Sequence, residues 1–221
     1  MFYRALELKQ KIFHLQVFEF PFILYNFAHK KMSRFLIVGL GNIGEEYKHT
    51  RHNIGFDIVD HLSQKLDVSF SSDRLADVAE AKYKGRQLTL IKPTTYMNLS
   101  GKAVLYWKNY FKLPVENILV LVDELAFPLG QFKLHPKGSN GGHNGLKSIE
   151  ESLQTTQYPR LRFGIGNNFP KGKQVEYVLG KWKDEEWKIV QEKIPLCSDA
   201  ILCFVFEGIQ NAMNKYNNKN I

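Results

Sequence analysis

Five polar side chains in this sequence are of the types that base-assisted hydrolysis requires. His52 is a neutral base near pH 7 and can accept a proton from water. Asp123 can hold the other imidazole nitrogen, which fixes the tautomer and stabilises the imidazolium. Asn42, Asn98 and Asn144 can donate to carbonyl or hydroxyl oxygens without adding charge. Together these types predict attack by water on an activated bond such as an ester.

These polar clusters follow expected strands, which would bring them to one edge of a sheet. Asp123 directly follows the apolar run 118–122, Asn98 follows the expected strand 87–92, and Asn144 follows a further short strand. Ligands of open α/β sheets bind outside the carboxyl ends of the strands. We therefore expect the five side chains to converge on one cleft.

Strands alternate with helices along the chain, and one pair of strands forms a hairpin. This order predicts α/β architecture: a single domain with a twisted mixed β-sheet flanked by α-helices. The expected strands are 34–38, 76–83, 87–92, 118–122, 131–135 and 160–165. The expected helices are 53–66, one capped by Asn98 or Ser100 and closed before Pro114, one opening near Asn144, and 184–216 in two pieces around Pro195.

The segment 39–44 fits the G-x-G-x-x-G spacing of a dinucleotide-binding turn. In that fold the helix begins within the glycine motif, so that its N-terminus faces the pyrophosphate. Here the amphipathic pattern starts only at Ile54, and Glu45 and Glu46 would place two carboxylates near the phosphates. The segment is therefore interpreted as a strand-end loop that presents Asn42, and we expect no cofactor.

The sequence offers no clear nucleophile or metal site. Ser139 lacks the G-x-S-x-G spacing of a nucleophile elbow. Cys197 and Cys203 lie in an apolar stretch, which predicts core filling and offers neither a disulfide framework nor zinc-ligand spacing. We therefore expect no bound metal, and the cysteine usage suits a reducing cytoplasm.

The chain of 221 residues carries a formal charge of +8, which favours anionic partners, chiefly nucleic acid. A basic enzyme with scattered lysines has the same balance, so charge alone barely separates the two. At 44% hydrophobic residues the chain can bury a sizeable core.

Residues 1–31 differ in character from the rest of the chain. Their apolar part is too interrupted for a membrane span and lacks the pattern of a signal peptide. We expect Met32 to be the true start, residues 1–31 to be a mis-assigned extension, and residues 32–221 to form the domain. The alternative is a real amphipathic appendage or an organelle-type presequence, and sequencing the mature N-terminus would decide between them.

Several ordered motifs together resemble the bacterial peptidyl-tRNA hydrolase family. They are GLGNIGEEYKHTRHNIGF, KPTTYMNLSGKAV, the Asp123-Glu124 pair, KGSNGGHNGLKSI, RLRFGIG and YVLGKW. The resemblance implies hydrolysis of the ester between a nascent peptide and the 3′ ribose of tRNA, which recycles tRNA from abandoned translation. It also implies a cytoplasmic, generally monomeric enzyme that binds the acceptor stem and 3′ CCA end of peptidyl-tRNA, with no cofactor, membrane or required protein partner.

The family roles transfer to individual positions of this sequence. By resemblance, His52 is the base that activates water, and Asp123 is the acid that holds it. Asn42 corresponds to the residue that distinguishes N-blocked aminoacyl esters from free ones. Asn98 and Asn144 correspond to residues that bind the peptide and the acceptor end.

Contacts to tRNA are also implied by the resemblance. Tyr47 and Tyr96 match positions that contact the tRNA end, partly by stacking. A basic pair binds the 5′ phosphate in this family, and Lys133 and Arg162 are the candidates. Close rivals for that pair are His135 and Arg160.

Two local features and one alternative function complete the expectation. Ile43 stands where the family usually has proline, which could loosen the turn that aims Asn42. His143 is expected to have no role. The alternative is a non-catalytic RNA-binding protein on the same scaffold, because some organellar relatives act in intron splicing without hydrolysis. The retained His52 and Asp123 favour the enzyme, since binding alone does not need a base held by an acid.

Overall fold

The computed structural model describes residues 33–218, so the expected extension 1–31 and the boundary at Met32 lie outside the described residues. Within residues 33–218, seven strands form one sheet. They are β1 (Arg34–Gly39), β2 (Ser71–Asp73), β3 (Ala76–Tyr83), β4 (Arg86–Pro93), β5 (Ile118–Glu124), β6 (Phe132–His135) and β7 (Arg160–Gly164).

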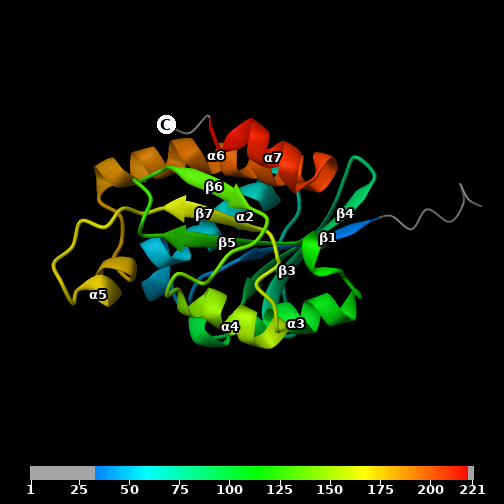
Figure 1. The fold of residues 1–221 in the computed structure, drawn as a ribbon, viewed down its shortest axis with the longest axis horizontal. Coiled ribbons are helices and arrows are strands. Elements are labelled where there is room, and N and C mark those ends of the chain that lie inside the picture. The colour runs from blue at the N-terminus through cyan, green and yellow to red at the C-terminus, as the bar shows by residue number, and fades with distance from the viewer. Residues whose placement is uncertain (1–32, 219–221) are drawn as a thin grey trace, which may run out of the picture. The chain divides into compact units, whose positions relative to one another are not determined.

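The strand order is β2-β3-β4-β1-β5-β7-β6, and the sheet is mixed (Figure 1). The four central strands β4, β1, β5 and β7 are parallel to one another. The pairs β2–β3, β3–β4 and β6–β7 are antiparallel. This topology confirms the predicted mixed sheet and its β3–β4 hairpin. The polar edge strand β2 was not predicted, because its three exposed residues carry no apolar alternation.

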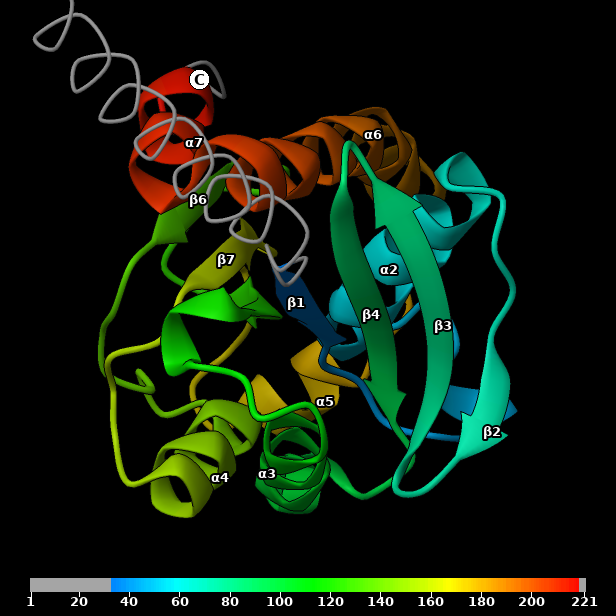
Figure 2. The same ribbon diagram turned by 90° about the vertical axis from the view of Figure 1, so that its right-hand side faces the viewer.

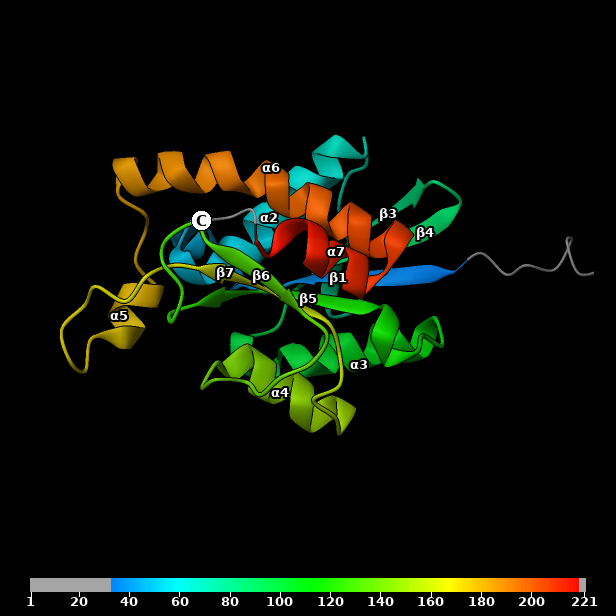
Figure 3. The same ribbon diagram turned by 45° about the horizontal axis from the view of Figure 1, so that its top comes forward.

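Helices cover both faces of the sheet. The helices α2, α6 and α7 pack on one face and α3 and α4 on the other, whereas α5 lies beyond the end at which β5 and β7 finish (Figures 2 and 3). Across the described residues, none of the helices combines the length and apolar character that a membrane span needs. Their bounds are α2 (Ile54–Lys65), α3 (Ser100–Tyr110), α4 (Asn144–Leu153), α5 (Gln174–Val178), α6 (Asp184–Glu207) and α7 (Ile209–Tyr216).

The central strands are apolar because both of their faces are buried. Leu36 and Val38 of β1 contribute to the core under α3 and α4, whereas Ile37 between them points into the core under α2 and α6. In β5 the whole run 118–122 is buried. Continuous apolar runs of this kind are characteristic of parallel strands covered on both sides, so the sequence signal and the packing agree.

The two C-terminal helices are divided at a different residue from the one predicted. We expected the division at Pro195, but α6 continues through that residue, and the chain turns at Gly208 with φ of 86°. Proline inside a helix costs roughly 3 kcal/mol locally. The flanking residues Ile194 and Cys197 are buried in the core, and their packing keeps the helix continuous.

The helix caps also differ from expectation. Neither Asn98 nor Ser100 caps α3 through its side chain: Asn98 lies in the 3₁₀ turn Met97–Leu99, and the Ser100 hydroxyl donates to the Met97 carbonyl. At α4 the cap is His143, whereas Asn144 is the first helical residue. Sequence spacing located the starts of α3 and α4 but not their capping residues.

Candidate active site

Two glycines bring the segment that carries His52 close to the ends of β1 and β5. Gly39 at the end of β1 faces Gly55 in the first turn of α2, and a Cβ on Gly39 would lie 2.4 Å from the Gly55 carbonyl oxygen. A Cβ on Gly55 would lie 2.4 Å from the Leu40 nitrogen. Both approaches are possible only without a side chain. The glycine pattern therefore allows close packing of helix on strand, and the 3₁₀ turn Arg51–Asn53 enters the edge of the sheet beside β5.

His52 and Asp123 form a hydrogen-bonded pair at this edge. Nδ1 of His52 lies 2.9 Å from Oδ1 of Asp123, whose side chain is only 3% exposed at the end of β5. An ionised carboxylate can only accept hydrogen bonds. Nδ1 therefore carries the proton, and Nε2 keeps the lone pair with which a general base accepts a proton from water.

A second histidine binds the same carboxylate oxygen, contrary to the expectation that it has no role. Nε2 of His143 lies 2.9 Å from Oδ1 of Asp123. Its Nδ1 accepts from the backbone N–H groups of Gly145 at 3.1 Å and Leu146 at 3.3 Å, which caps α4. Because Nδ1 accepts, the imidazole proton is on Nε2 and is donated to Asp123. The only sequence signal for this role was the position of His143 directly before Asn144.

Burial and the contacts between His52 and Asp123 have opposite effects on the pKa of each group. Burial lowers the pKa of His52, but the charge of Asp123 and the hydrogen bond to it prevail, and the pKa lies above its ordinary value of 6.5. Burial would raise the pKa of Asp123, yet the charges and hydrogen bonds of His52 and His143 hold it far below its usual range. Asp123 therefore stays ionised, as a group that stabilises an imidazolium must.

The three groups also have the composition of a metal site, since their donor atoms all lie within 4.8 Å of one another. The hydrogen bonds argue against this use. A ligating histidine commonly donates through its second nitrogen, whereas Nδ1 of His143 accepts from two backbone N–H groups. Its Nε2 already bears the proton that a metal would have to replace. The set therefore fits proton transfer better than metal binding.

Asn42 is held by a neighbour whose role was not predicted. The buried Asn53 accepts from the Asn42 backbone N–H through Oδ1 and donates from Nδ2 to the Asn42 carbonyl, both at 2.9 Å. The side-chain oxygen of Asn42 accepts from the Met97 N–H at 3.2 Å, which leaves its NH₂ group to donate to a ligand. The exposed Ile43 follows directly. Two hydrogen bonds between Asn53 and Asn42 thus tie the turn that carries Ile43 to the segment that carries His52.

The predicted residues line one cleft of about 480 Å³, with four exceptions, one of which is the buried Arg160. Tyr47 lies outside this lining, in the 3₁₀ turn Glu45–Tyr47, and Lys133 and His135 also lie outside it. Tyr96 is 72% exposed at the cleft. The predicted residues that line the cleft are Asn42, His52, Tyr96, Asn98, Asp123, Asn144 and Arg162.

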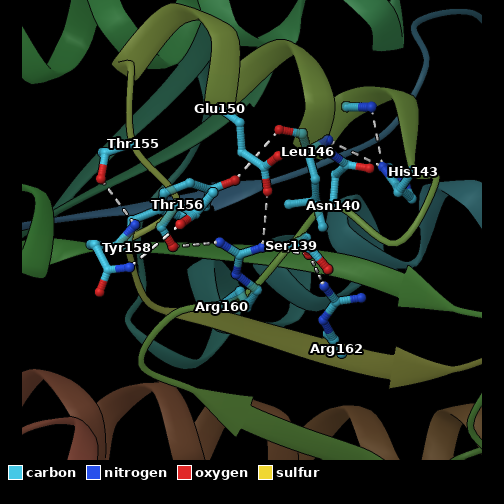
Figure 4. Close-up of polar contacts among 12 residues, drawn as sticks. Ser139, Asn140, His143, Leu146, Glu150, Thr155, Thr156, Tyr158, Arg160 and Arg162 are labelled. Carbon is cyan, nitrogen blue, oxygen red and sulfur yellow. Dashed lines mark hydrogen bonds and ion pairs between the residues drawn. The ribbon is translucent and has the colours of Figure 1, made fainter.

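The four basic candidates for the phosphate site lie on one face of β6 and β7. They differ in burial and in the contacts that their side chains already make within the protein. Lys133 and Arg162 are direct partners in the antiparallel register. Arg162 binds the Glu124 carboxylate and the Ser139 carbonyl. Arg160 is fully buried, donates to two backbone carbonyls and lies over the Tyr158 ring, which makes it a structural residue (Figure 4). Burial and then the nearby Arg162, Arg160 and Lys133 lower the pKa of His135.

A polar network supports the loop that leads to His143. Asn140 donates to Glu150 of α4 at 2.7 Å, and its Oδ1 accepts from the Gly142 N–H at 3.0 Å. Arg160 and Arg162 both donate to the Ser139 carbonyl from below (Figure 4). These contacts tie the loop to α4 and to β7, so that it reaches the cleft with a defined path.

A parallel-centred α/β sheet with a histidine, a buried carboxylate and amide side chains gathered at the ends of its strands is the arrangement expected of a hydrolase that uses a general base. Comparison with known proteins gives the family within this class. The family model for peptidyl-tRNA hydrolase matches residues 36–221. This chain belongs to the peptidyl-tRNA hydrolase family.

Individual relatives agree with the family match over their whole length. Peptidyl-tRNA hydrolases from Phocaeicola vulgatus and Cytophaga hutchinsonii are 51% and 52% identical over 186 residues, which is 84% of this chain and 100% and 99% of the relatives. The crystal structure of peptidyl-tRNA hydrolase from Acinetobacter baumannii is 34% identical with a TM-score of 0.80, covering 86% of this chain and 97% of that one. The predicted α/β fold is therefore confirmed.

Proposed function

We propose that His52, held by Asp123, activates the water that cleaves the ester between a nascent peptide and the 3′ end of tRNA. Hydrolysis of peptidyl-tRNA is the activity supported by the family match and by the curated relatives. The observation that carries the assignment of the base is the Nδ1–Oδ1 hydrogen bond of 2.9 Å, which leaves Nε2 of His52 free to accept a proton at the cleft.

The proposed reaction proceeds through general-base and then general-acid steps. Nε2 of His52 takes a proton from water as the water oxygen bonds to the ester carbonyl carbon. Asp123 stabilises the imidazolium that results, because it accepts the hydrogen bond from Nδ1. The bond from the carbonyl carbon to the ribose oxygen then breaks, and the imidazolium returns the proton to that oxygen. The products are the free peptide carboxylic acid and the tRNA hydroxyl.

The amide side chains are proposed to hold the substrate around this reaction. The NH₂ group of Asn42 would donate to the carbonyl of the N-blocking group, which a free aminoacyl ester lacks. Asn98 and Asn144 would bind the peptide and the acceptor end, and the exposed Tyr96 would stack on the tRNA end. Their shared position in the lining of the cleft supports these roles.

The acceptor stem and 3′ CCA end are the proposed tRNA contacts, with Lys133 and Arg162 as the 5′ phosphate pair. Their cross-strand register places both on one face, which supports a shared ligand. The Glu124 carboxylate on Arg162 would have to share that guanidinium with the phosphate. Tyr47 remains a proposed contact from outside the cleft. We propose the cytoplasm as the place of action, since translation supplies the substrate there.

The alternative, a non-catalytic RNA-binding protein, is not favoured. The curated relatives are hydrolases, and the base, the acid and the amide donors are all present in one cleft. The two functions separate in one assay, because a binding protein would bind peptidyl-tRNA without releasing the peptide.

The test is release of an N-acetyl-aminoacyl group from tRNA at neutral pH. We expect turnover by the unmodified chain and a loss of about 10²–10⁴-fold in His52→Ala. His49→Ala is the matched control, because His49 also pairs with a carboxylate, Asp57 at 2.8 Å, but lies outside the cleft. Its activity should be unchanged. Full activity in His52→Ala would refute the assignment of the base.

A further inference from the structure

We propose that Arg51 is a positioning residue that holds α5, one wall of the cleft, against the turn that carries His52. This proposal rests on the proposed function, because it concerns how the position of the base His52 is fixed relative to the cleft wall. Arg51 precedes His52 in the turn Arg51–Asn53, and it is 5% exposed despite its charge.

Among the described residues, the Arg51 side chain hydrogen-bonds to the segment that runs from the end of α5 into the first turn of α6. One terminal nitrogen of the guanidinium donates to the carbonyls of Tyr177 at 3.3 Å, Gly180 at 3.2 Å and Lys181 at 3.0 Å. The other donates to Glu186 at 2.6 Å. The backbone N–H of Arg51 adds a bond to the Gly180 carbonyl at 3.1 Å.

These carbonyls belong to the last turn of α5 and to the residues that follow it directly. The last carbonyls of a helix have no partner within it, and a cation placed there is favoured. Tyr177 belongs to the last turn of α5, and its ring centre lies 4.3 Å from the guanidinium carbon of Arg51. The planar guanidinium can bond several carbonyls and pack on a ring at once, whereas an ammonium group on a flexible stem cannot.

The segment held in this way contributes part of the cleft lining. Gln174 and Val175 of α5 line the cleft, as do Val178 and Leu179 where the helix ends. Because α5 lies beyond the sheet, its position depends on such ties (Figure 3). A shift of α5 would change the shape of the pocket and, through Arg51, the position of the neighbouring base.

The turn Arg51–Asn53 thus contains three consecutive residues with three different attachments. Arg51 binds the α5 segment, His52 binds Asp123, and Asn53 clamps Asn42. We infer that this turn is the point at which the wall, the base and the amide donor are fixed relative to one another.

The test compares kcat and KM of Arg51→Lys with those of the unmodified chain, at a temperature well below the melting point of either. A role in stability alone would leave both constants of the folded molecules unchanged. A positioning role predicts a lower kcat and a higher KM, with kcat/KM reduced between about tenfold and 100-fold. By contrast, His52→Ala should lower kcat with little change in KM.

Two further variants make the result decisive. Arg34→Lys is the matched control, because Arg34 is another ion-paired guanidinium, lies 4.0 Å from the centre of the Phe111 ring, and sits at the opposite end of β1. Its kcat and KM should not change. Glu186→Gln keeps the bonds to the carbonyls and should lose less activity than Arg51→Lys.

The outcomes separate this proposal from the proposed function. Unchanged kcat and KM in Arg51→Lys, together with an inactive His52→Ala, would overturn the positioning role and leave the base in place. Equal losses in Glu186→Gln and Arg51→Lys would also overturn it, since the carbonyl contacts would then be irrelevant. An active His52→Ala would instead refute the proposed function.

Discussion

At the scale of the residue, one oxygen of Asp123 accepts hydrogen bonds from two imidazoles. The negative charge of Asp123 is therefore shared between His52 and His143. We therefore predict that His143→Ala moves the acidic limb of the pH–rate profile to higher pH, because Asp123 then acts on His52 alone. The profile of kcat between pH 5 and 8 measures this shift. An acidic limb that stays in place would show that His143 serves only as a helix cap.

The capping role of His143 can be measured separately. His143→Ala removes the acceptor for two backbone N–H groups of α4 and should cost about 1 kcal/mol of unfolding free energy. His143→Asn keeps a capping oxygen and should recover most of that stability. The shift in the pH profile should persist in His143→Asn, because the imidazole Nε2 that binds Asp123 is removed.

Asn42 carries a prediction about selectivity. Its oxygen is occupied by the Met97 N–H, so its NH₂ group is the part available to the substrate. Asn42→Ala or Asn42→Asp should therefore cleave unblocked aminoacyl-tRNA better, relative to the N-acetylated substrate, than the unmodified chain does. The ratio of kcat/KM for the two substrates measures this change. An unchanged ratio would contradict the proposed role.

The sequence was informative about residues whose type reveals their chemistry and less so about residues that act through others. His52, Asp123 and Asn42 were selected by type and motif, and the structure brings them into one cleft. Arg51 and Asn53 were not selected, because their partners lie 135 and 11 residues away in the chain and only folding pairs them. His143 was missed for the same reason.

At the scale of the element, the approach of α2 to β1 sets the position of the base. We predict that Gly55→Ala lowers the unfolding free energy by about 1–3 kcal/mol, since its Cβ would collide with the Leu40 backbone. It should also lower kcat, because the turn before α2 would move with the helix. Thermal melting and ester release measure the two effects. Gln64→Ala, on an exposed position of the same helix, is the control and should change neither.

The elements were predictable where the apolar residues follow a regular pattern along the chain. The strands β1, β3, β4, β5 and β7 and the helix α2 match their predicted places within one or two residues. The break between α6 and α7 was misplaced, because burial of Ile194 and Cys197 stabilises the helix across Pro195. Packing energy of this kind cannot be read from a local sequence signal.

At the scale of the whole molecule, the charge of +8 predicts salt-dependent binding of tRNA. Lys133→Ala should weaken binding of deacylated tRNA and reduce the slope of log affinity against log salt by about one. Lys84→Ala is the control, because Lys84 lies in the β3–β4 turn at the opposite end of the sheet. Titrations at several salt concentrations measure both slopes. Equal slopes for Lys133→Ala and the unmodified chain would exclude Lys133 as a phosphate contact.

The central claim is that Asp123 orients the base His52 and raises its pKa. The pH dependence of single-turnover ester release tests this claim most directly. Because Asp123 raises the pKa of His52, the unmodified chain should lose activity as pH falls through a value above 6.5. In Asp123→Asn the acidic limb should move to lower pH and the plateau rate should fall, with little change in tRNA binding. An acidic limb at the same pH in both proteins would contradict the account.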